Sequence, residues 1–72
     1  MAMDTGMIAS AGETEEIAKL SKAFYAEKDK SLSDDILRQQ IARCQEIAFG
    51  YGLPTLPLGR FYFVTSSGKI IK

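Results

Sequence analysis

The residue types that carry most enzymatic chemistry are scarce in this chain. It contains no histidine, one cysteine (Cys44) and one adjacent pair of acids, Asp34 and Asp35. Histidine is the commonest general acid–base in enzymes, and histidine and cysteine are the usual zinc ligands. Adjacent residues on a helix point about 100° apart, so the two aspartates suit the start of a helix better than a shared reaction. The sequence therefore predicts a protein that is not an enzyme and that holds no metal or cofactor.

Cys44 lies on an apolar stripe along a predicted helix. The stripe is formed by Leu37, Ile41, Cys44, Ala48 and Tyr51, at spacings of four, three, four and three residues. This spacing places all five side chains on one face of a helix. A thiol on such a face behaves as a small buried apolar group, so we predict that Cys44 is buried and structural.

The last third of the chain holds the residues best suited to contact another molecule. All nine acidic residues lie at or before Glu46, so the basic residues that follow have no neighbouring carboxylate in the sequence. The two-residue period of a strand places Phe61 and Phe63 on one face and Tyr62 on the other. We expect the phenylalanines to face the helices and Tyr62 to face outward. The predicted partner-binding residues are Arg60, Tyr62, Lys69 and Lys72.

A basic residue beside an exposed tyrosine can anchor a protein interface, grip a phosphate or stack on a nucleobase. It can also belong to an ordinary solvated surface. The chain has a formal net charge of zero, whereas non-specific nucleic-acid binders usually carry a basic excess. We therefore predict non-enzymatic binding to a protein partner, of the inhibitor or adaptor type, together with self-association into a homo-oligomer. Binding to nucleic acid is the alternative.

That alternative rests on a resemblance within residues 46–72. The run Glu-Ile-Ala at 46–48, followed by Gly-Leu at 52–53, is similar to the helix-turn-helix pattern of bacterial transcription factors. The resemblance implies a recognition helix that begins near Thr55 and a wing formed by residues 66–72. A later glycine and the Phe-Tyr-Phe-Val run depart from the pattern, because neither is typical of a helix.

Two helices are predicted before this segment. Apolar residues recur at helical spacing over residues 13–29 and again over residues 34–49. Ser33 is a suitable N-cap for the second helix, since its hydroxyl can accept a bond from a free N–H of the first turn. Gly50 is a suitable left-handed residue just after the end of that helix. The short connection predicts an antiparallel helical hairpin.

The remaining segment is predicted to form a stiff connection and two strands. Residues 52–59 contain both prolines, each of which fixes its own φ. Arg60–Val64 is rich in strand-forming residues, Thr65–Gly68 is typical of a turn with a left-handed glycine, and Lys69–Lys72 returns. The predicted fold is α+β: an antiparallel helical hairpin followed by a proline-stiffened crossover and a C-terminal β-hairpin.

A chain of 72 residues forms one domain at most. We predict a single domain over residues 13–72 and a mobile N-terminal arm over residues 1–12. The alternative for the arm is a short strand through Met7 and Ile8 that docks on a partner. No apolar run approaches the roughly 20 residues that span a bilayer, and residues 1–12 lack the basic start of a signal peptide. These features predict a cytoplasmic protein without a membrane partner.

Overall fold

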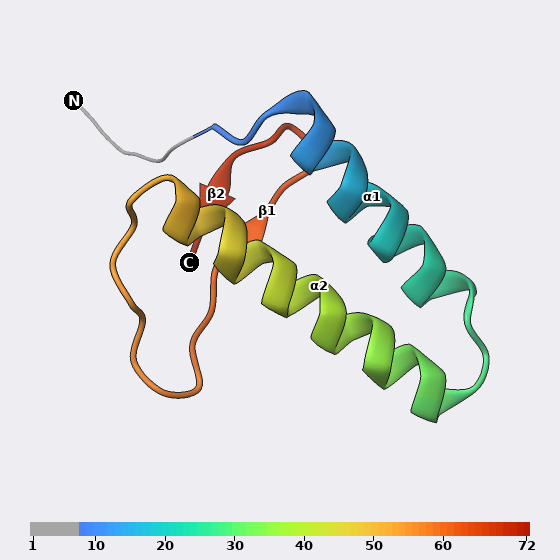
Figure 1. The fold of residues 1–72 in the computed structure, drawn as a ribbon. Helices are drawn as coiled ribbons and strands as arrows, with labels where there is room; N and C mark the ends of the chain where they lie inside the picture. The colour runs from blue at the N-terminus through green and yellow to red at the C-terminus, as the bar shows by residue number, and fades with distance from the viewer. Residues whose placement is uncertain (1–7) are drawn as a thin grey trace.

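The computed structural model describes residues 8–72 and contains two helices and two short strands (Figure 1). Helix α1 spans Ala11–Ala26 and helix α2 spans Lys30–Gly50. Strand β1 spans Phe63–Val64 and strand β2 spans Ile70–Ile71. The helices pack together as a hairpin, and the strands form an antiparallel sheet after them. The predicted α+β fold is therefore confirmed.

Helix α1 begins at Ala11, two residues before the predicted start, because Ser10 caps it. The Ser10 hydroxyl accepts a hydrogen bond from the Glu13 backbone N–H at 3.2 Å. In return, the Ser10 N–H donates to Glu13 Oε1 at 3.0 Å. This reciprocal pair is a capping box, which satisfies two backbone donors that a helix start otherwise leaves free. The helix ends at Ala26, three residues earlier than predicted.

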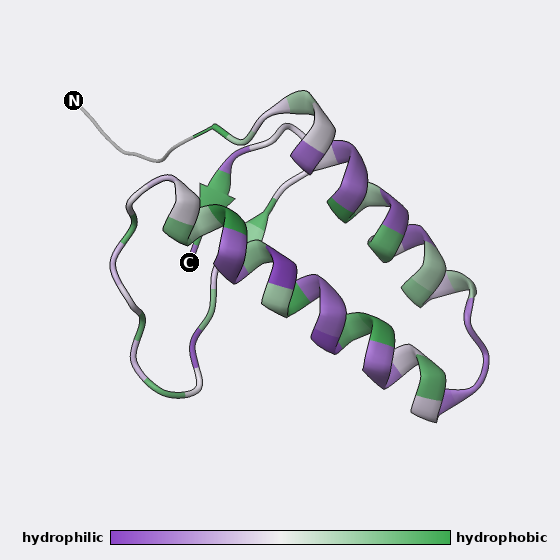
Figure 2. Ribbon diagram, viewed as in Figure 1, coloured by the Kyte–Doolittle hydropathy of each residue, from purple (hydrophilic) through white to green (hydrophobic). Residues whose placement is uncertain are grey.

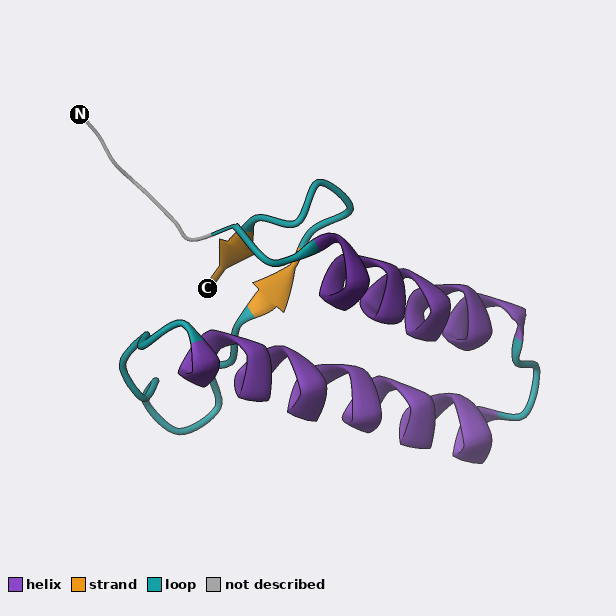
Figure 3. Cartoon of the chain, turned by 45° about the horizontal axis from the view of Figure 1, so that its top comes forward, coloured by secondary structure: helices purple, strands orange, loops and turns teal. Residues whose placement is uncertain are grey.

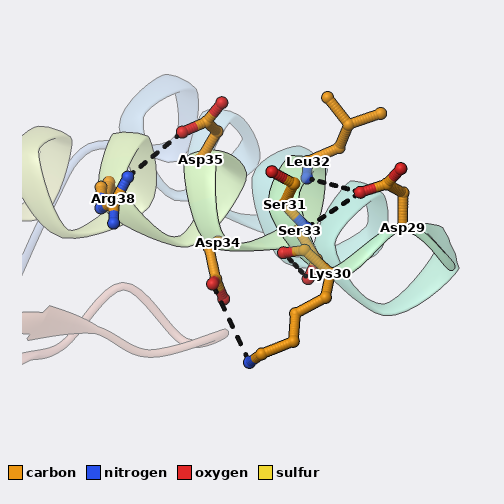
Figure 4. A network of polar contacts seen from close by, with 8 residues as sticks. All are labelled: Asp29, Lys30, Ser31, Leu32, Ser33, Asp34, Asp35 and Arg38. Carbon is orange, nitrogen blue, oxygen red and sulfur yellow. Dashed lines mark hydrogen bonds and ion pairs between the residues drawn. The ribbon is translucent and has the colours of Figure 1, made fainter.

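Helix α2 begins at Lys30, and the prediction that Ser33 is its N-cap is wrong. The cap is Asp29, whose carboxylate accepts hydrogen bonds from the backbone N–H groups of Ser31 at 2.9 Å and Leu32 at 3.3 Å (Figure 4). Ser33 lies inside the first turn, where its hydroxyl donates to the Lys30 carbonyl at 3.0 Å. A carboxylate at the cap also interacts favourably with the positive end of the helix dipole. The earlier cap therefore lengthens α2 by one turn.

Helix α2 ends one residue later than predicted, and the left-handed glycine after it lies two residues later than predicted. Gly50 is the last helical residue, and the left-handed position is Gly52, with φ of 79°. The Tyr51 N–H still bonds the Ile47 carbonyl at 3.2 Å, and the Leu53 N–H bonds the Ala48 carbonyl at 3.1 Å. These bonds satisfy carbonyl groups in the last turn of the helix, so the chain leaves the helical direction only at Gly52.

Residues 53–62 form a connection without helix or strand, drawn as a long loop in Figure 1. Pro54 and Pro57 interrupt it, and Gly59 has a left-handed φ of 85°. The recognition helix expected near Thr55 is absent, because each proline removes a backbone donor and disfavours helix in the residue before it. The loop is closed at its base, where the Tyr62 hydroxyl donates to the Pro54 carbonyl.

The β-hairpin pairs Phe63 with Ile71 and Val64 with Ile70, so its strands are shorter than predicted. The predicted turn is confirmed: Gly68 has φ of 88°, and its N–H bonds the Thr65 carbonyl at 2.9 Å. Next to the turn, the Thr65 N–H donates a hydrogen bond to the Lys69 carbonyl at 2.9 Å.

A third segment joins this sheet from the other end of the described chain. Ile8 forms an antiparallel bridge with Lys69, and the Ala9 N–H donates to the Gly68 carbonyl at 2.6 Å. Of the predicted arm 1–12, residues 8–12 thus belong to the sheet and to the start of α1. Residues 1–7 lie outside the described residues. Ile8 does form strand pairing, but with its own chain.

The core lies between the sheet and one end of the helical hairpin, made by the start of α1 and the end of α2 (Figure 3). Every buried apolar residue of the described chain contributes to it. The core residues are Ala9, Ile17, Cys44, Ile47, Ala48, Tyr62, Val64 and Ile70. Cys44 is among the most buried side chains, which confirms its predicted position.

We expect Cys44→Ala to lower the free energy of unfolding by about 1 kcal/mol, because the small cavity that it leaves is surrounded by packed side chains. Burial raises the pKa of the Cys44 thiol, while the Val64 backbone N–H opposes that rise. A bulky thiol reagent should therefore label the native protein slowly and the unfolded protein fast. Fast labelling of the native protein would contradict the buried position.

Within residues 8–72, neither helix combines the length and the apolar character that crossing a bilayer requires.

Candidate outer-face binding site

The register of β1 places Tyr62 inside the protein, so the expectation that Tyr62 faces outward is wrong. Tyr62 is 2% exposed, whereas Phe63 is 45% exposed. Both alternating sets of residues on this strand are apolar, so the two-residue period alone did not say which set faces the helices. The tyrosine is accommodated because its hydroxyl finds an acceptor in the Pro54 carbonyl.

The opposite side of the sheet, here called the outer face, is formed by Ile8, Phe63, Lys69 and Ile71. Residues directly opposite in an antiparallel pair point to the same side, which joins Phe63 to Ile71 and Ile8 to Lys69. Lys69 and Ile71 are two residues apart and share that side as well. The three apolar side chains are well exposed: Ile8 by 63%, Phe63 by 45% and Ile71 by 41%.

Two further basic residues lie at one edge of the outer face. Arg60 and Lys72 line a hollow of about 260 Å³ together with Gly59, Phe61 and Phe63. The rings of Phe61 and Phe63 meet edge to face, with centroids 4.9 Å apart. Two rings packed in this way give an apolar surface beside the two cations.

The structure thus brings together three of the four predicted partner-binding residues. Arg60 and Lys72 share the hollow, and Lys69 lies on the same outer face. Tyr62 does not join them, and Phe63 occupies the place expected for it. Ile71 was not predicted as a site residue, although it lies in the predicted hairpin opposite Phe63. Ile8 was predicted only in the alternative strand that docks on a partner. Its place on the outer face depends on pairing with Lys69, far along the sequence, for which no local signal exists.

The positive charge of the outer face is uncompensated. The ion pairs of residues 8–72 are all made by residues of the two helices, between Lys30 and Asp34, Arg38 and Asp35, and Arg43 with Glu16 and Glu46. No acidic residue follows Glu46 in the sequence. Exposed cations beside exposed apolar groups are suited to an interface, where the apolar groups supply the burial and the charges orient the partner.

A polar cluster of Ser10, Glu13 and Tyr51 lies where the start of α1 meets the end of α2. The Tyr51 hydroxyl donates to Glu13 Oε1 at 2.8 Å and accepts from the Ser10 N–H at 3.0 Å. The Ser10 N–H and then the Tyr51 hydroxyl lower the pKa of Glu13. The bond to Glu13, followed by burial, raises the pKa of Tyr51. The cluster joins the start of α1 to the end of α2.

We expect this cluster to make stability depend on pH at both extremes. Glu13 has a pKa below its ordinary value of 4.5, so its contribution is complete above pH 4.5 and is lost as pH falls through the lowered pKa. Tyr51 has a pKa above its ordinary value of 10.0, so its contribution is complete below pH 10 and is lost as pH rises through the raised pKa.

Urea unfolding at pH 7 and pH 3 measures the acid side of this dependence. Glu13→Gln should lose less stability between the two pH values than the unaltered protein does. Glu15→Gln is the matched control, since Glu15 is exposed on the same helix. Equal acid sensitivity in Glu13→Gln and the unaltered protein would assign the effect to other carboxylates.

Comparison with known proteins gives no family for this arrangement: no family model matches the chain, and no curated protein or solved structure matches it either.

Proposed function

We propose that this chain is a non-enzymatic binding protein, of the inhibitor or adaptor type, and that it contacts an acidic protein partner through its outer face. The observation that carries the proposal is the set of exposed apolar side chains of Ile8, Phe63 and Ile71 beside the cations Arg60, Lys69 and Lys72. Single exposed apolar residues are ordinary on protein surfaces, whereas a contiguous group rimmed by charge marks an interaction surface.

Charge decides which partner suits this face. A second copy of the chain packed face to face would bring cations against cations, which costs free energy. A nucleic acid would bind mainly through its phosphates and would need many basic contacts, of which this face offers three. The Phe63 ring could stack on a base, but Ile8 and Ile71 could not. An extended or folded protein segment with apolar residues flanked by carboxylates matches both features of the face.

Two sets of synthetic peptides test the proposal directly. In one set apolar residues alternate with glutamate, and in the other they alternate with lysine. We expect the immobilised protein to retain members of the glutamate set and none of the lysine set, with retention that weakens as salt rises. Retention of random-sequence duplex DNA in place of the glutamate peptides would favour the nucleic-acid alternative. Retention of neither would refute the proposed partner class.

Phe63→Ser should weaken binding of the best glutamate peptide by about 2 kcal/mol or more, the scale of an aromatic anchor at an interface. Folding should be little affected, because exposed substitutions usually change stability by less than about 0.5 kcal/mol. Leu32→Ser is the control, since Leu32 is also exposed but lies on α2, away from the sheet. Calorimetric titration measures the affinities, and equal losses in both variants would count against the outer face.

Charge reversal tests the basic part of the same face. Arg60→Glu combined with Lys72→Glu should reduce affinity for the glutamate peptides about tenfold or more, which is about 1.4 kcal/mol, and should reduce its dependence on salt. The control carries the same charge change at Lys19 and Lys28, which are exposed on or after α1. If the two double variants bind equally well, the charge of the outer face does not select the partner.

A further inference from the structure

The hollow at the edge of the outer face combines positive charge with aromatic surface. Arg60 and Lys72 supply the charge, and Phe61 and Phe63 supply the rings. Both strands are hydrophobic, whereas hydrophilic residues lie in the chain shortly before β1 and at both ends of β2 (Figure 2). Arg60 precedes β1 and Lys72 follows β2, so the pairing of the strands brings cations from two separate segments to the same hollow.

The backbone that carries these cations is fixed on both sides of the hollow. The Arg60 N–H donates to the carbonyl of Pro57 at 3.0 Å, and Gly59 between them has a left-handed φ of 85°. On the other side, the residue before Lys72 pairs with Phe63. A ligand therefore meets cations whose main-chain positions are already set, which lowers the cost of ordering the site on binding.

The charge of the hollow favours a phosphoryl group. All ion pairs of residues 8–72 belong to helix residues, and no acidic residue follows Glu46. A carboxylate carries a single negative charge, so it would neutralise only one of Arg60 and Lys72. A phosphoryl group carries about −1.5 to −2 at pH 7 and has three acceptor oxygens, which suit an arginine fork together with a lysine ammonium group.

The rings of the hollow favour an aromatic group beside that phosphoryl group. Phe61 and Phe63 meet edge to face at an angle of 66°, and Phe63 is 45% exposed, so part of its ring is accessible to a third ring. The hollow measures about 260 Å³, which is below the usual volume of about 300–1,000 Å³ for a small-molecule pocket. A space of this size suits one large side chain.

We propose that the hollow binds a phosphotyrosine side chain of the protein partner, with the phosphoryl group between Arg60 and Lys72 and the phenol ring against Phe63. The inference rests on the proposed function, because it names the residue through which an acidic partner occupies this edge of the outer face. Phosphoserine offers the charge without the ring, tyrosine offers the ring without the charge, and glutamate offers neither the second charge nor the ring. The site therefore prefers phosphotyrosine to all three.

Four synthetic peptides that differ at one position test the proposal. Their flanking sequence is that of the best glutamate peptide, and the variable residue is phosphotyrosine, phosphoserine, tyrosine or glutamate. In calorimetric titration, we expect the phosphotyrosine peptide to bind at least about tenfold more tightly than each of the others. If the glutamate peptide binds and phosphotyrosine gives no advantage, this inference is wrong and the proposed function stands. If no peptide binds, both are wrong.

Substitutions in the hollow separate the charge from the ring. Arg60→Gln should weaken binding of the phosphotyrosine peptide at least about tenfold and leave the tyrosine peptide unaffected. Lys28→Gln is the matched control, since Lys28 is exposed and lies between the helices. Phe63→Leu keeps an apolar side chain and removes the ring, so it should abolish the preference for phosphotyrosine over phosphoserine. Unchanged phosphotyrosine binding in Arg60→Gln would overturn the proposal.

Competition with small compounds identifies the group that the hollow recognises. Phenyl phosphate should displace the phosphotyrosine peptide at a concentration at least about tenfold below that required of inorganic phosphate, because only phenyl phosphate also supplies the ring. Equal competition by inorganic phosphate would show a site for anions alone. Stronger competition by adenosine monophosphate than by phenyl phosphate would show a nucleotide site. Either outcome would overturn the assignment to phosphotyrosine.

Discussion

Tyr62→Ala is expected to lower the free energy of unfolding by about 3–5 kcal/mol, the usual cost of removing a large buried aromatic ring. Domains of this size have a total stability of about 4–11 kcal/mol, at roughly 0.05–0.15 kcal/mol per residue, so the substitution should remove a large share of the total. The loss has two sources, because the ring fills the core and the hydroxyl holds the Pro54 carbonyl. Urea unfolding followed by circular dichroism measures it.

Tyr62→Phe separates the two sources. It keeps the ring and removes only the hydrogen bond, which should cost about 0.5–1.5 kcal/mol, the usual net contribution of one hydrogen bond. The loop of residues 53–59 should then be cleaved faster by a non-specific protease, while the rest of the fold persists. If Tyr62→Ala folded like the unaltered protein and lost only peptide binding, Tyr62 would be a contact residue, as the sequence predicts.

Gly68→Ala is expected to destabilise the protein by about 2–4 kcal/mol, the sum of left-handed backbone strain and overpacking. Gly68 has φ of 88°. A Cβ atom at this position would lie 2.9 Å from Thr14 Oγ1 and 3.2 Å from the Ala9 carbonyl oxygen. Relief of these contacts would push the 8–10 segment away from the sheet. Thermal unfolding gives the cost, and faster hydrogen exchange at the Ala9 N–H would locate it.

Gly52→Ala is the control for backbone strain. Gly52 has a similar φ of 79°, but a Cβ atom there would meet nothing within 4 Å. Its cost should be about 1–2 kcal/mol, the penalty for a left-handed alanine. The difference between the two variants therefore measures the close packing of the turn against Ala9 and Thr14. Equal costs would show that this packing adds nothing.

The order and type of the elements could be predicted because their signals are local. Apolar residues at helical spacing, two prolines after the second helix and a glycine at the turn each depend on neighbours in the sequence. Cys44 was placed correctly for the same reason, since the stripe on α2 passes through it. Helix starts were less certain, because Asp29 and Ser33 are both good caps and only the structure shows which of them accepts the backbone bonds.

The candidate site could be predicted only in part. No acidic residue follows Glu46, which predicts that Arg60, Lys69 and Lys72 form no ion pair. None of the three takes part in the ion pairs of residues 8–72, and all three are exposed. The register of β1 could not be derived, because Phe61 and Phe63 are as apolar as Tyr62 and Val64 are. Contact between the start and the end of the described chain also leaves no pattern in a single sequence.

The pairing of Ile8 with Lys69 has a consequence for the order of folding. The helical hairpin depends on contacts between neighbours in the chain and can form in microseconds. The sheet is different, since Ile8 must meet Lys69, about 60 residues later, and closing a loop of that length costs about 3–4 kcal/mol of chain entropy. We therefore expect the outer face to be the last part of the molecule to assemble, so that a partner that recognises this face selects only chains whose folding is complete.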